Sequence, residues 1–228
     1  IMDAVGYQSV RDVTICATPQ TGKTEASYNC LGYWADRDPG PALIVFQDEG
    51  IASDEKRERI DPMFKQSPRL RSYLSSKSQD STTHRLQMEH MVVHMGWATS
   101  VSRLATKPKR YVIFDECDKY PEVLRKEADP ISLGEKRTRT YPETKKIIRI
   151  STPTWEEGPI WTSYQGAQFR FVYYVRCPDC NEWQLMRFGS KDSPGGIKFP
   201  PDIRDPNVIE VEKLVWYECE YCGSCWDD

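Results

Sequence analysis

Residues 17–24 read ATPQTGKT, and this stretch decides the prediction of the fold. It fits the phosphate-loop pattern G-x-x-x-x-G-K-[ST] at every fixed position but the first, where Ala17 replaces glycine. An apolar run at residues 13–17 predicts a buried strand before the loop, and residues 23–34 predict a helix that begins at its end. This strand, loop and helix favour a nucleotide-binding α/β domain over a chance turn that contains Gly-Lys-Thr.

The residues of the loop have separate tasks in holding a polyphosphate. Gly22 lets backbone amides approach the phosphates, and the following helix supplies unpaired N–H groups and the positive end of its dipole. The Lys23 side chain can reach the β- and γ-phosphates, and the Thr24 hydroxyl can bind Mg²⁺. We therefore expect a nucleotide and a magnesium ion at this loop.

Further apolar runs predict a parallel sheet. Each is rich in β-branched side chains, as expected for strands buried on both faces, and they cover residues 42–46, 91–95, 111–114 and 147–150. A charged surface helix is expected over residues 55–64, with its start capped near Ser53, and a loop over residues 75–83. The alternation of strands and helices predicts a doubly wound α/β fold.

Two carboxylates end the strand predicted at residues 111–114. In a phosphate-loop ATPase the first acid, Asp115, would hold Mg²⁺, and the second, Glu116, would polarise the attacking water as a general base. An acid pair at this position can instead stabilise the first turn of a helix. The phosphate loop earlier in the chain favours the catalytic interpretation. The sequence continues to Asp118 as Asp-Glu-Cys-Asp, which also fits the D-E-x-D pattern of helicase-type motors.

A third strand end carries hydroxyl groups. Residues 147–150 run into Ser151, Thr152 and Pro153. Side chains at the carboxyl ends of parallel strands lie in the crevice where ligands bind, so these groups can contact a γ-phosphate or its water and report hydrolysis. The alternative is an ordinary polar strand end followed by a proline turn. After two nucleotide motifs we favour the sensor.

Five of the eight cysteines lie in the last part of the chain. Cys177-x-x-Cys180 and Cys219-x-x-Cys222 form two knuckles, and such pairs suit a tetrahedral zinc site that is structural. Cys225 forms a further knuckle with Cys222, but we assign the site to the first four. The alternative interpretations are reduced surface thiols or a single redox pair.

The net charge of −3 conceals a basic middle of the chain. Residues 1–50 carry −4, residues 51–150 carry +7, and residues 151–228 carry −6. The basic segment suits contact with a phosphate backbone or, for single arginines, completion of a neighbouring subunit's active site. The candidates are Arg103, Arg137 and Arg139. Solvated helix faces would account for most of the other basic residues.

The length of 228 residues and the 39% apolar content indicate one domain with a small satellite. We place the boundary near residue 167, giving a motor domain over residues 1–167 and a zinc-ribbon-like subdomain over residues 168–228 that begins with a strand at residues 169–175. No apolar run is long enough for a membrane span, and no secretory signal is visible. The start at Ile1 suggests a fragment of a longer protein.

These motifs together resemble the lambda-type (GpA-type) large terminase subunit of tailed phages. The resemblance rests on ATPQTGKTE at residues 17–25, DECDKYP at 115–121, GEKR at 134–137, ISTPT at 150–154 and RCPDC at 176–180, in this order. It implies a phosphate-loop ATPase fold of the additional-strand, catalytic-glutamate class. It also implies ATP binding by Thr18, Gln20, Thr21, Gly22, Lys23, Thr24 and Glu25, magnesium binding by Thr24 and Asp115, catalysis by Glu116 with Lys23, and coupling of hydrolysis to DNA movement by Ser151, Thr152 and Pro153.

The resemblance further implies ATP, Mg²⁺ and structural Zn²⁺ as cofactors. The expected partners are double-stranded DNA, the portal or procapsid, the small terminase subunit and other copies in a ring, in the host cytoplasm. The family's nuclease domain is expected to be missing here, and Gln8 is a candidate contact to adenine. A single lobe of a DEAD-box-like helicase and a non-hydrolysing zinc-ribbon assembly module are the alternatives. Only a hydrolase needs the second carboxylate, Glu116.

Overall fold

The computed structural model describes residues 1–77, 80–105, 107–121, 129–189 and 193–226. The chain divides into two compact units, Ile1–Gln168 (unit 1) and Phe169–Asp228 (unit 2), and each is described by itself. Among the residues that are described, no helix has the length and apolar character needed to cross a membrane.

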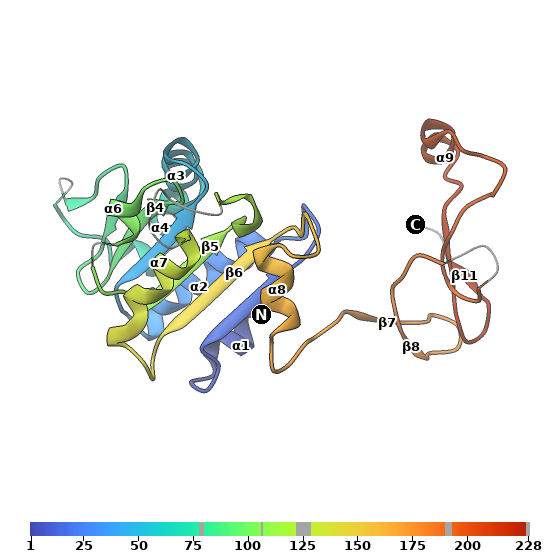
Figure 1. The fold of residues 1–228 in the computed structure, drawn as a ribbon, viewed down its shortest axis with the longest axis horizontal. Helices are drawn as coiled ribbons and strands as arrows, with labels where there is room; N and C mark the ends of the chain where they lie inside the picture. Colours follow the sequence, from blue (N-terminus) through green and yellow to red (C-terminus); the bar gives the residue numbers. More distant parts are fainter. Residues whose placement is uncertain (78–79, 106, 122–128, 190–192, 227–228) are drawn as a thin grey trace. The chain divides into compact units, whose positions relative to one another are not determined.

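A six-stranded, mostly parallel sheet forms the centre of unit 1 (Figure 1). Its order is β1-β6-β5-β2-β4-β3, and only β3 runs antiparallel to its neighbour. The strands are β1 (Asp12–Cys16), β2 (Ala42–Phe46), β3 (Arg85–Gln87), β4 (Val92–Trp97), β5 (Tyr111–Asp115) and β6 (Lys146–Ser151). The α/β prediction is therefore confirmed. The order also places β6 between β1 and β5.

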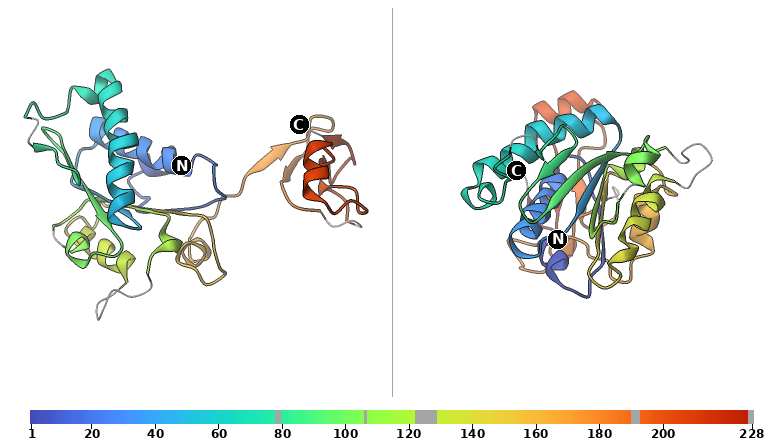
Figure 2. Two further views of the ribbon diagram at one scale, coloured as in Figure 1. Left: turned by 90° about the horizontal axis from the view of Figure 1, so that it is seen from above. Right: turned by 90° about the vertical axis from the view of Figure 1, so that its left-hand side faces the viewer.

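Helices cover both faces of this sheet (Figure 2). One face carries α1 (Met2–Gly6), α2 (Lys23–Arg37) and a continuous helical run of α3 (Glu49–Glu55), the π-helix η1 (Lys56–Ile60) and α4 (Asp61–Gln66), followed by α5 (Pro68–Arg71). The other face carries α6 (Val101–Leu104), α7 (Pro130–Lys136) and α8 (Pro159–Gln165). Two 3₁₀ turns, η3 (Cys117–Lys119) and η4 (Arg137–Thr140), complete the unit.

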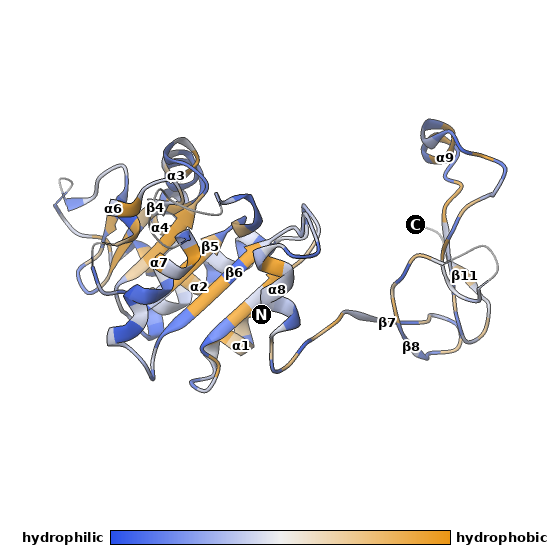
Figure 3. Cartoon of the chain, in the orientation of Figure 1, coloured by the Kyte–Doolittle hydropathy of each residue, from blue (hydrophilic) through white to orange (hydrophobic). Residues whose placement is uncertain are grey.

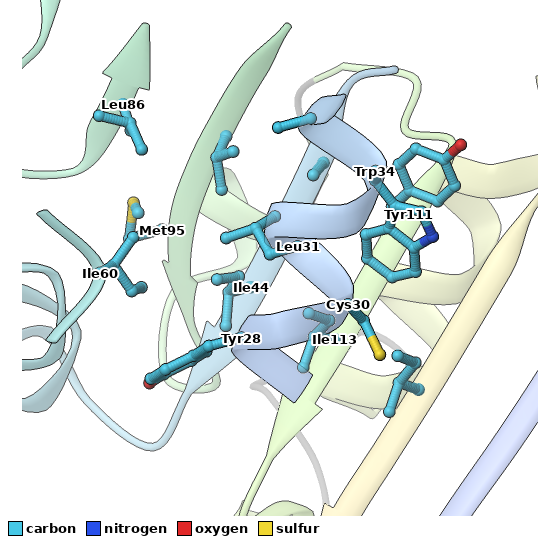
Figure 4. Close-up of a cluster of buried hydrophobic side chains, with 14 of the residues drawn as sticks. Tyr28, Cys30, Leu31, Trp34, Ile44, Ile60, Leu86, Met95, Tyr111 and Ile113 are labelled. Atoms are coloured by element: carbon cyan, nitrogen blue, oxygen red, sulfur yellow. The ribbon is translucent and has the colours of Figure 1, made fainter. Parts of the chain in front are cut away.

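Side chains of the central strands β2 and β5 alternate between two hydrophobic clusters, as the pleat of a strand requires. In β2, Ala42, Ile44 and Phe46 join the cluster under α2, while Leu43 and Val45 join the cluster under α6, α7 and α8. Figure 4 shows part of the first cluster, with Trp34 stacked on Tyr111 at a centroid distance of 4.1 Å. Figure 3 shows hydrophobic residues along the central strands, which is why these runs form a sheet buried on both faces.

Unit 2 consists of short strands and loops. β7 (Tyr174–Arg176) pairs with β8 (Trp183–Leu185), and β10 (Trp216–Glu218) pairs with β9 (Gly196–Lys198) and β11 (Cys225–Trp226), all antiparallel. A short helix, α9 (Pro206–Val211), lies between β9 and β10 in the chain. These pairs are too small to enclose a large apolar core, so unit 2 needs another source of stability.

Two expectations from the sequence are wrong. The helix expected to start near Ser53 begins at Glu49, because the Asp48 side chain accepts a hydrogen bond from the Ile51 backbone N–H and caps the helix there. The strand expected over residues 169–175 is formed only at Tyr174–Arg176, because the neighbouring strand β8 is three residues long and pairs with no more of the chain.

Candidate functional site

The predicted nucleotide motifs meet at the carboxyl edge of the sheet in unit 1. The phosphate loop follows β1, Asp115 ends β5, and Ser151 ends β6. The strands lie side by side in the order β1, β6, β5, with Cys16 opposite Ser151 and Asp115 opposite Ile150. Because the three strands are parallel, their carboxyl ends lie along one edge, where open α/β sheets bind ligands.

The phosphate loop owes its shape to backbone conformations that favour glycine. Gly22 has φ +77° and precedes the first residue of α2, and Gln20 also has a positive φ of 59°. A Cβ at Gly22 would meet no atom within 4 Å, so the requirement for glycine is conformational rather than steric. The Thr21 hydroxyl donates to the Thr18 carbonyl at 2.9 Å and closes the loop.

Lys23 joins the three strand ends. Its ammonium group lies 3.0 Å from Glu116 Oε1, 3.2 Å from Thr152 Oγ1 and 3.4 Å from the Thr18 carbonyl oxygen. The side chain is only 7% exposed. A single buried cation thus contacts the loop after β1, the acid after β5 and the hydroxyl after β6.

The two carboxylates after β5 have different environments. Asp115 is buried, and its Oδ1 atom has no hydrogen-bond partner within the described part of the chain. Burial, followed by the nearby charges of Glu116 and Glu55, raises the pKa of Asp115 to about 7. A buried carboxylate oxygen without a donor suits a metal ion, because a cation would supply the missing positive charge. Glu116 has a left-handed backbone with φ 52°, and Lys119 lies 3.4 Å from its Oε2 atom.

Asp118 ties the acidic end of β5 to the segment that follows β6. The side chain is 2% exposed, and its Oδ2 accepts hydrogen bonds from the backbone N–H and the hydroxyl of Thr154 at 3.0 and 3.2 Å. Its Oδ1 accepts a 2.7 Å bond from the Ile160 N–H in α8. A Cβ on Gly158 would lie 2.6 Å from Asp118 Oδ2, so this close approach requires glycine. The Asp118 backbone N–H also donates to the Ser151 hydroxyl.

A pocket of about 280 Å³ opens beside the loop. It is lined by Gln20, Gly22, Lys23, Thr24, Glu25 and Arg59. Thr24 and Glu25 are in the first turn of α2, while Arg59 comes from the π-helix η1. Five of the six lining residues were predicted as nucleotide contacts. Arg59 was not, because nothing in its local sequence shows that η1 lies against the start of α2.

The four cysteines predicted as metal ligands come together in unit 2. All four Sγ atoms lie within 4.8 Å of one another, and the Cys177–Cys222 and Cys180–Cys219 distances are both 3.8 Å. A tetrahedral zinc with Zn–S bonds of about 2.3 Å separates its sulfurs by about 3.8 Å. The set therefore fits a metal ion of this kind. Cys225 lies outside the group and contacts the Gly223 carbonyl instead.

Backbone and side-chain donors surround these sulfurs. The Cys180 N–H donates to Cys177 Sγ, and the Tyr221 N–H donates to Cys219 Sγ. The buried Gln184 amide donates to Cys219 Sγ at 3.4 Å and accepts from the Glu220 N–H at 3.1 Å. Such donors orient thiolate ligands and favour their negative charge. Gln184 was missed, because a lone glutamine in a short strand carries no recognisable pattern.

A family model described as "Phage terminase large subunit gpA, ATPase domain" matches residues 1–228. The chain belongs to this family. It is 25% identical over 231 residues to the terminase large subunit of Escherichia phage lambda, and 25% identical over 233 residues to that of Enterobacteria phage P21. The alignments cover 97% and 98% of this chain but 34% of each relative, so the chain spans about a third of their length.

Solved structures agree with this family assignment at the level of the fold. The Thermus phage P74-26 large terminase ATPase domain has a TM-score of 0.53 and 13% identity, covering 81% of this chain and 76% of that one. The recognition made from the motifs is therefore confirmed. The family favours a terminase ATPase domain over a helicase lobe and over a module that only binds DNA.

The three candidate arginines of this terminase domain lie at two opposite edges of the sheet. Arg103, in α6, follows the carboxyl end of β4, and its guanidinium lies 4.9 Å from the Trp97 ring centroid. Arg137 and Arg139 are in η4, which precedes β6, and the Arg137 carbonyl accepts from the Lys109 N–H just before β5. η4 therefore lies toward the amino edge, away from Lys23 and Glu116. Gln8 also lines a pocket at that edge, with Arg110 and Lys146, and does not approach the phosphate loop.

Proposed function

We propose that this chain is the ATP-hydrolysing motor domain of a DNA-packaging terminase, in which hydrolysis drives double-stranded DNA into a procapsid. The observation that carries the proposal is the Lys23 ammonium group, which contacts Glu116 and Thr152 from the phosphate loop. Lys23 contacts the phosphate loop, the carboxylate of Glu116 and the hydroxyl of Thr152. A change in what Lys23 binds would therefore act directly on the segment after β6.

The strand order supports the additional-strand, catalytic-glutamate class of phosphate-loop ATPases. β6 lies between the strand that precedes the loop and the strand that ends in Asp115 and Glu116. With this insertion, the two acids approach the loop from the next strand but one. The segment after β6 therefore lies between the phosphate loop and the two acids.

In the proposed reaction each residue of this edge has one task. The N–H groups at the start of α2, with Gly22 and Lys23, would bind the phosphates, and Thr24 and Asp115 would hold Mg²⁺. The ion supplies positive charge to the phosphate oxygens when it is bound. Glu116 accepts a proton from the attacking water, and the Lys23 ammonium group exchanges its contact with this carboxylate for one with phosphate.

The segment after β6 is the proposed coupling element. Thr152 loses or keeps its contact with Lys23 according to what Lys23 binds, and Ser151 and Pro153 flank it. Asp118 fixes the next part of this segment, through Thr154, to the acidic strand end and to α8. A change at the phosphates can therefore move the backbone that leads out of the motor sheet.

The assignment is tested by ATP binding and turnover in Lys23→Ala. We expect binding to weaken by about 100-fold or more, because Lys23 is the one lysine among the described residues that line the pocket, and turnover to fall with it. Lys65→Ala is the matched control, since Lys65 is an exposed lysine on α4. Equal ATP affinity in wild type and Lys23→Ala would contradict the proposed site.

For the DNA partner, we propose a surface around Arg103 rather than around η4. Burial, and then the charges of Lys109, Lys107, Arg85 and Arg103, lower the pKa of His94 to about 4, which places these cations together. Among the described residues none of the four forms an ion pair with a carboxylate, whereas Arg110 pairs with Asp38. Lys109 is only 3% exposed and contacts His94 Nδ1, so the surface itself is formed by Arg85, Arg103 and Lys107. A concentration of unneutralised positive charge suits a phosphate backbone.

Salt dependence distinguishes this surface from its alternatives. Arg103→Ala and Lys107→Ala should each reduce the slope of log affinity for DNA against log salt by about one. Arg139 is an exposed arginine on η4, and Arg139→Ala should leave the slope unchanged. A reduced slope in this variant would place the DNA at η4 instead. If Arg137 or Arg139 instead acts on a neighbouring subunit, its loss lowers turnover of the ring only. The portal, the small subunit and the ring itself remain proposed partners.

Unit 2 is proposed to be a zinc ribbon whose role is structural. The sulfur positions and their N–H donors support this, and the set leaves no ligand position open for catalysis. Metal analysis of the purified protein should give about one zinc per chain. Less than half an equivalent, with free thiols, would contradict the ribbon.

A further inference from the structure

We propose that Arg59 is a second cationic contact to the phosphate chain of the nucleotide, held beside the loop by Glu25 and Glu55 until a nucleotide binds. The proposal rests on the proposed function, because it deepens the ATP site. None of the motifs includes Arg59, which lies in a separate helix and reaches the loop only through the fold.

The first observation is position. Arg59 lines the same pocket as Gln20, Gly22, Lys23 and Thr24. Its guanidinium stacks over the Tyr28 ring at 5.0 Å from the centroid, and Tyr28 belongs to α2. Figure 4 shows Tyr28 extending from α2 toward the segment that carries Ile60. The side chain is 35% exposed, so it is supported by the protein and still accessible from the pocket.

The second observation is the local backbone. The helical run from Glu49 to Gln66 is interrupted by a π-helical turn at Lys56–Ile60, and Arg59 lies within that turn. A π-turn adds a residue and rotates the side chains that follow, and such turns often occur at functional sites. Arg57, two residues earlier, is not among the described residues that line the pocket, and it pairs with Asp54 and Glu58 while 69% exposed.

The third observation is the set of partners. Arg59 Nη2 lies 2.9 Å from Glu25 Oε1, and Nη1 lies 3.3 Å from Glu55 Oε2, which also accepts a 2.7 Å bond from the Tyr28 hydroxyl. Glu25 is 61% exposed, so its ion pair with Arg59 is weakly stabilising and readily exchanged. A phosphate in the pocket offers the same planar guanidinium two oxygens with more charge.

The charge at the site also favours a second cationic side chain beside the proposed magnesium ion. The loop contributes only Lys23, which is already paired with Glu116, and Asp115 lies close by. A triphosphate brings about four negative charges beside these acids, and phosphoryl transfer depends on positive charge that is placed in advance. Exchange of Glu25 for phosphate would bring Arg59 into the site without moving the helix backbone.

The test compares equilibrium binding of ATP, ADP and adenosine by wild type, Arg59→Ala, Arg59→Lys and Arg57→Ala. We expect Arg59→Ala to weaken ATP binding by about 10- to 100-fold, ADP binding less, and adenosine binding not at all. Arg59→Lys should recover part of the loss. Arg57→Ala is the matched control from the same π-turn and should bind all three as wild type does.

A purely structural brace between η1 and α2 predicts a different pattern. In that case Arg59→Ala and Glu25→Gln would both lower the unfolding temperature without nucleotide and leave the ATP affinity unchanged, which overturns the proposal. If Arg59 exchanges Glu25 for phosphate as proposed, Glu25→Gln removes the competing carboxylate and tightens ATP binding several-fold. Failure of wild type to bind ATP at all would contradict the ATP site itself. Normal ATP binding by a folded Arg59→Ala would overturn the role of Arg59 alone.

Discussion

Unit 1 and unit 2 are stabilised in different ways. Unit 1 buries apolar side chains on both faces of its sheet, and its helices enclose two hydrophobic clusters. In the described part of unit 2, the buried hydrophobic residues are Cys177, Tyr217 and Cys219, and two of these are candidate metal ligands. Gln184, also buried, donates to one of them.

The difference indicates how cysteines at a suitable spacing can stabilise a unit that has almost no hydrophobic core. A unit of this size buries too little apolar area to offset its chain entropy, and natural domains of this size often add a metal or disulfides. Two Cys-x-x-Cys knuckles would achieve this by holding the proposed zinc with four side chains. Unit 1 is stabilised by its two hydrophobic clusters and needs no metal or disulfide. Its polar residues at the carboxyl edge of the sheet are therefore available for binding and catalysis.

The largest effect is expected from removal of the zinc ion proposed for unit 2. Structural zinc contributes on the order of 10 kcal/mol to folding of small domains, so chelation should unfold unit 2 and leave unit 1 folded. Limited proteolysis should then cut within residues 169–226 and release an intact fragment of unit 1. Cys177→Ser should behave in the same way, and Cys225→Ser should not, because Cys225 lies outside the cluster. Unchanged resistance of unit 2 after full metal removal would contradict the comparison.

A smaller effect, confined to unit 1, is expected from Leu43→Ala. Leu43 is 1% exposed and belongs to the cluster under α6, α7 and α8. Its truncation should lower the free energy of unfolding of unit 1 by about 2–5 kcal/mol through lost burial and a cavity. Denaturant unfolding measures the loss, while bound zinc should stay at the wild-type level. Loss of zinc in this variant would show that the units do not fold independently.

The smallest effect is a pH dependence of unit 1. The pKa of His94 is lowered to about 4 by burial and by Lys109, so the unfolded chain takes up a proton below about pH 6.5 that the folded chain does not. The free energy of unfolding is therefore unaffected by His94 above pH 6.5, and it decreases as the pH falls from 6.5 toward 4. His94→Gln should therefore flatten the stability profile between pH 6.5 and 4, by about 1–2 kcal/mol once the full conversion of about 3 kcal/mol is reduced for the partial exposure of His94 to solvent. An equally steep profile in the variant would assign the acid sensitivity to other groups.

Sequence patterns predicted the parts of this molecule that depend on local residues. The β2 strand occupies the predicted residues, because an uninterrupted apolar run has no competing structure. Strand direction alone places the phosphate loop, Asp115 and Ser151 at one edge. The same reasoning would have placed Arg137 and Arg139 at the other edge, because they precede β6.

The remaining features depend on contacts between distant segments. The aromatic run at residues 169–173 resembles a strand, but pairing requires a partner, and β8 is too short to provide one. The helix start was predicted near Ser53, whereas the cap that forms is the Asp48 side chain, which accepts from the Ile51 backbone N–H. The position of Arg59 beside Glu25 depends on a π-turn and on how two helices pack, neither of which has a signal in one sequence.

The central claim is that Glu116 activates water for hydrolysis at an ATP site in unit 1. The direct test is ATP binding and ATP turnover in Glu116→Gln, which removes the charge beside Lys23 and keeps the size of the side chain. We predict ATP binding within a few-fold of wild type and turnover reduced by about 100-fold or more. Turnover equal to that of the wild type, with ATP still bound, would contradict the account.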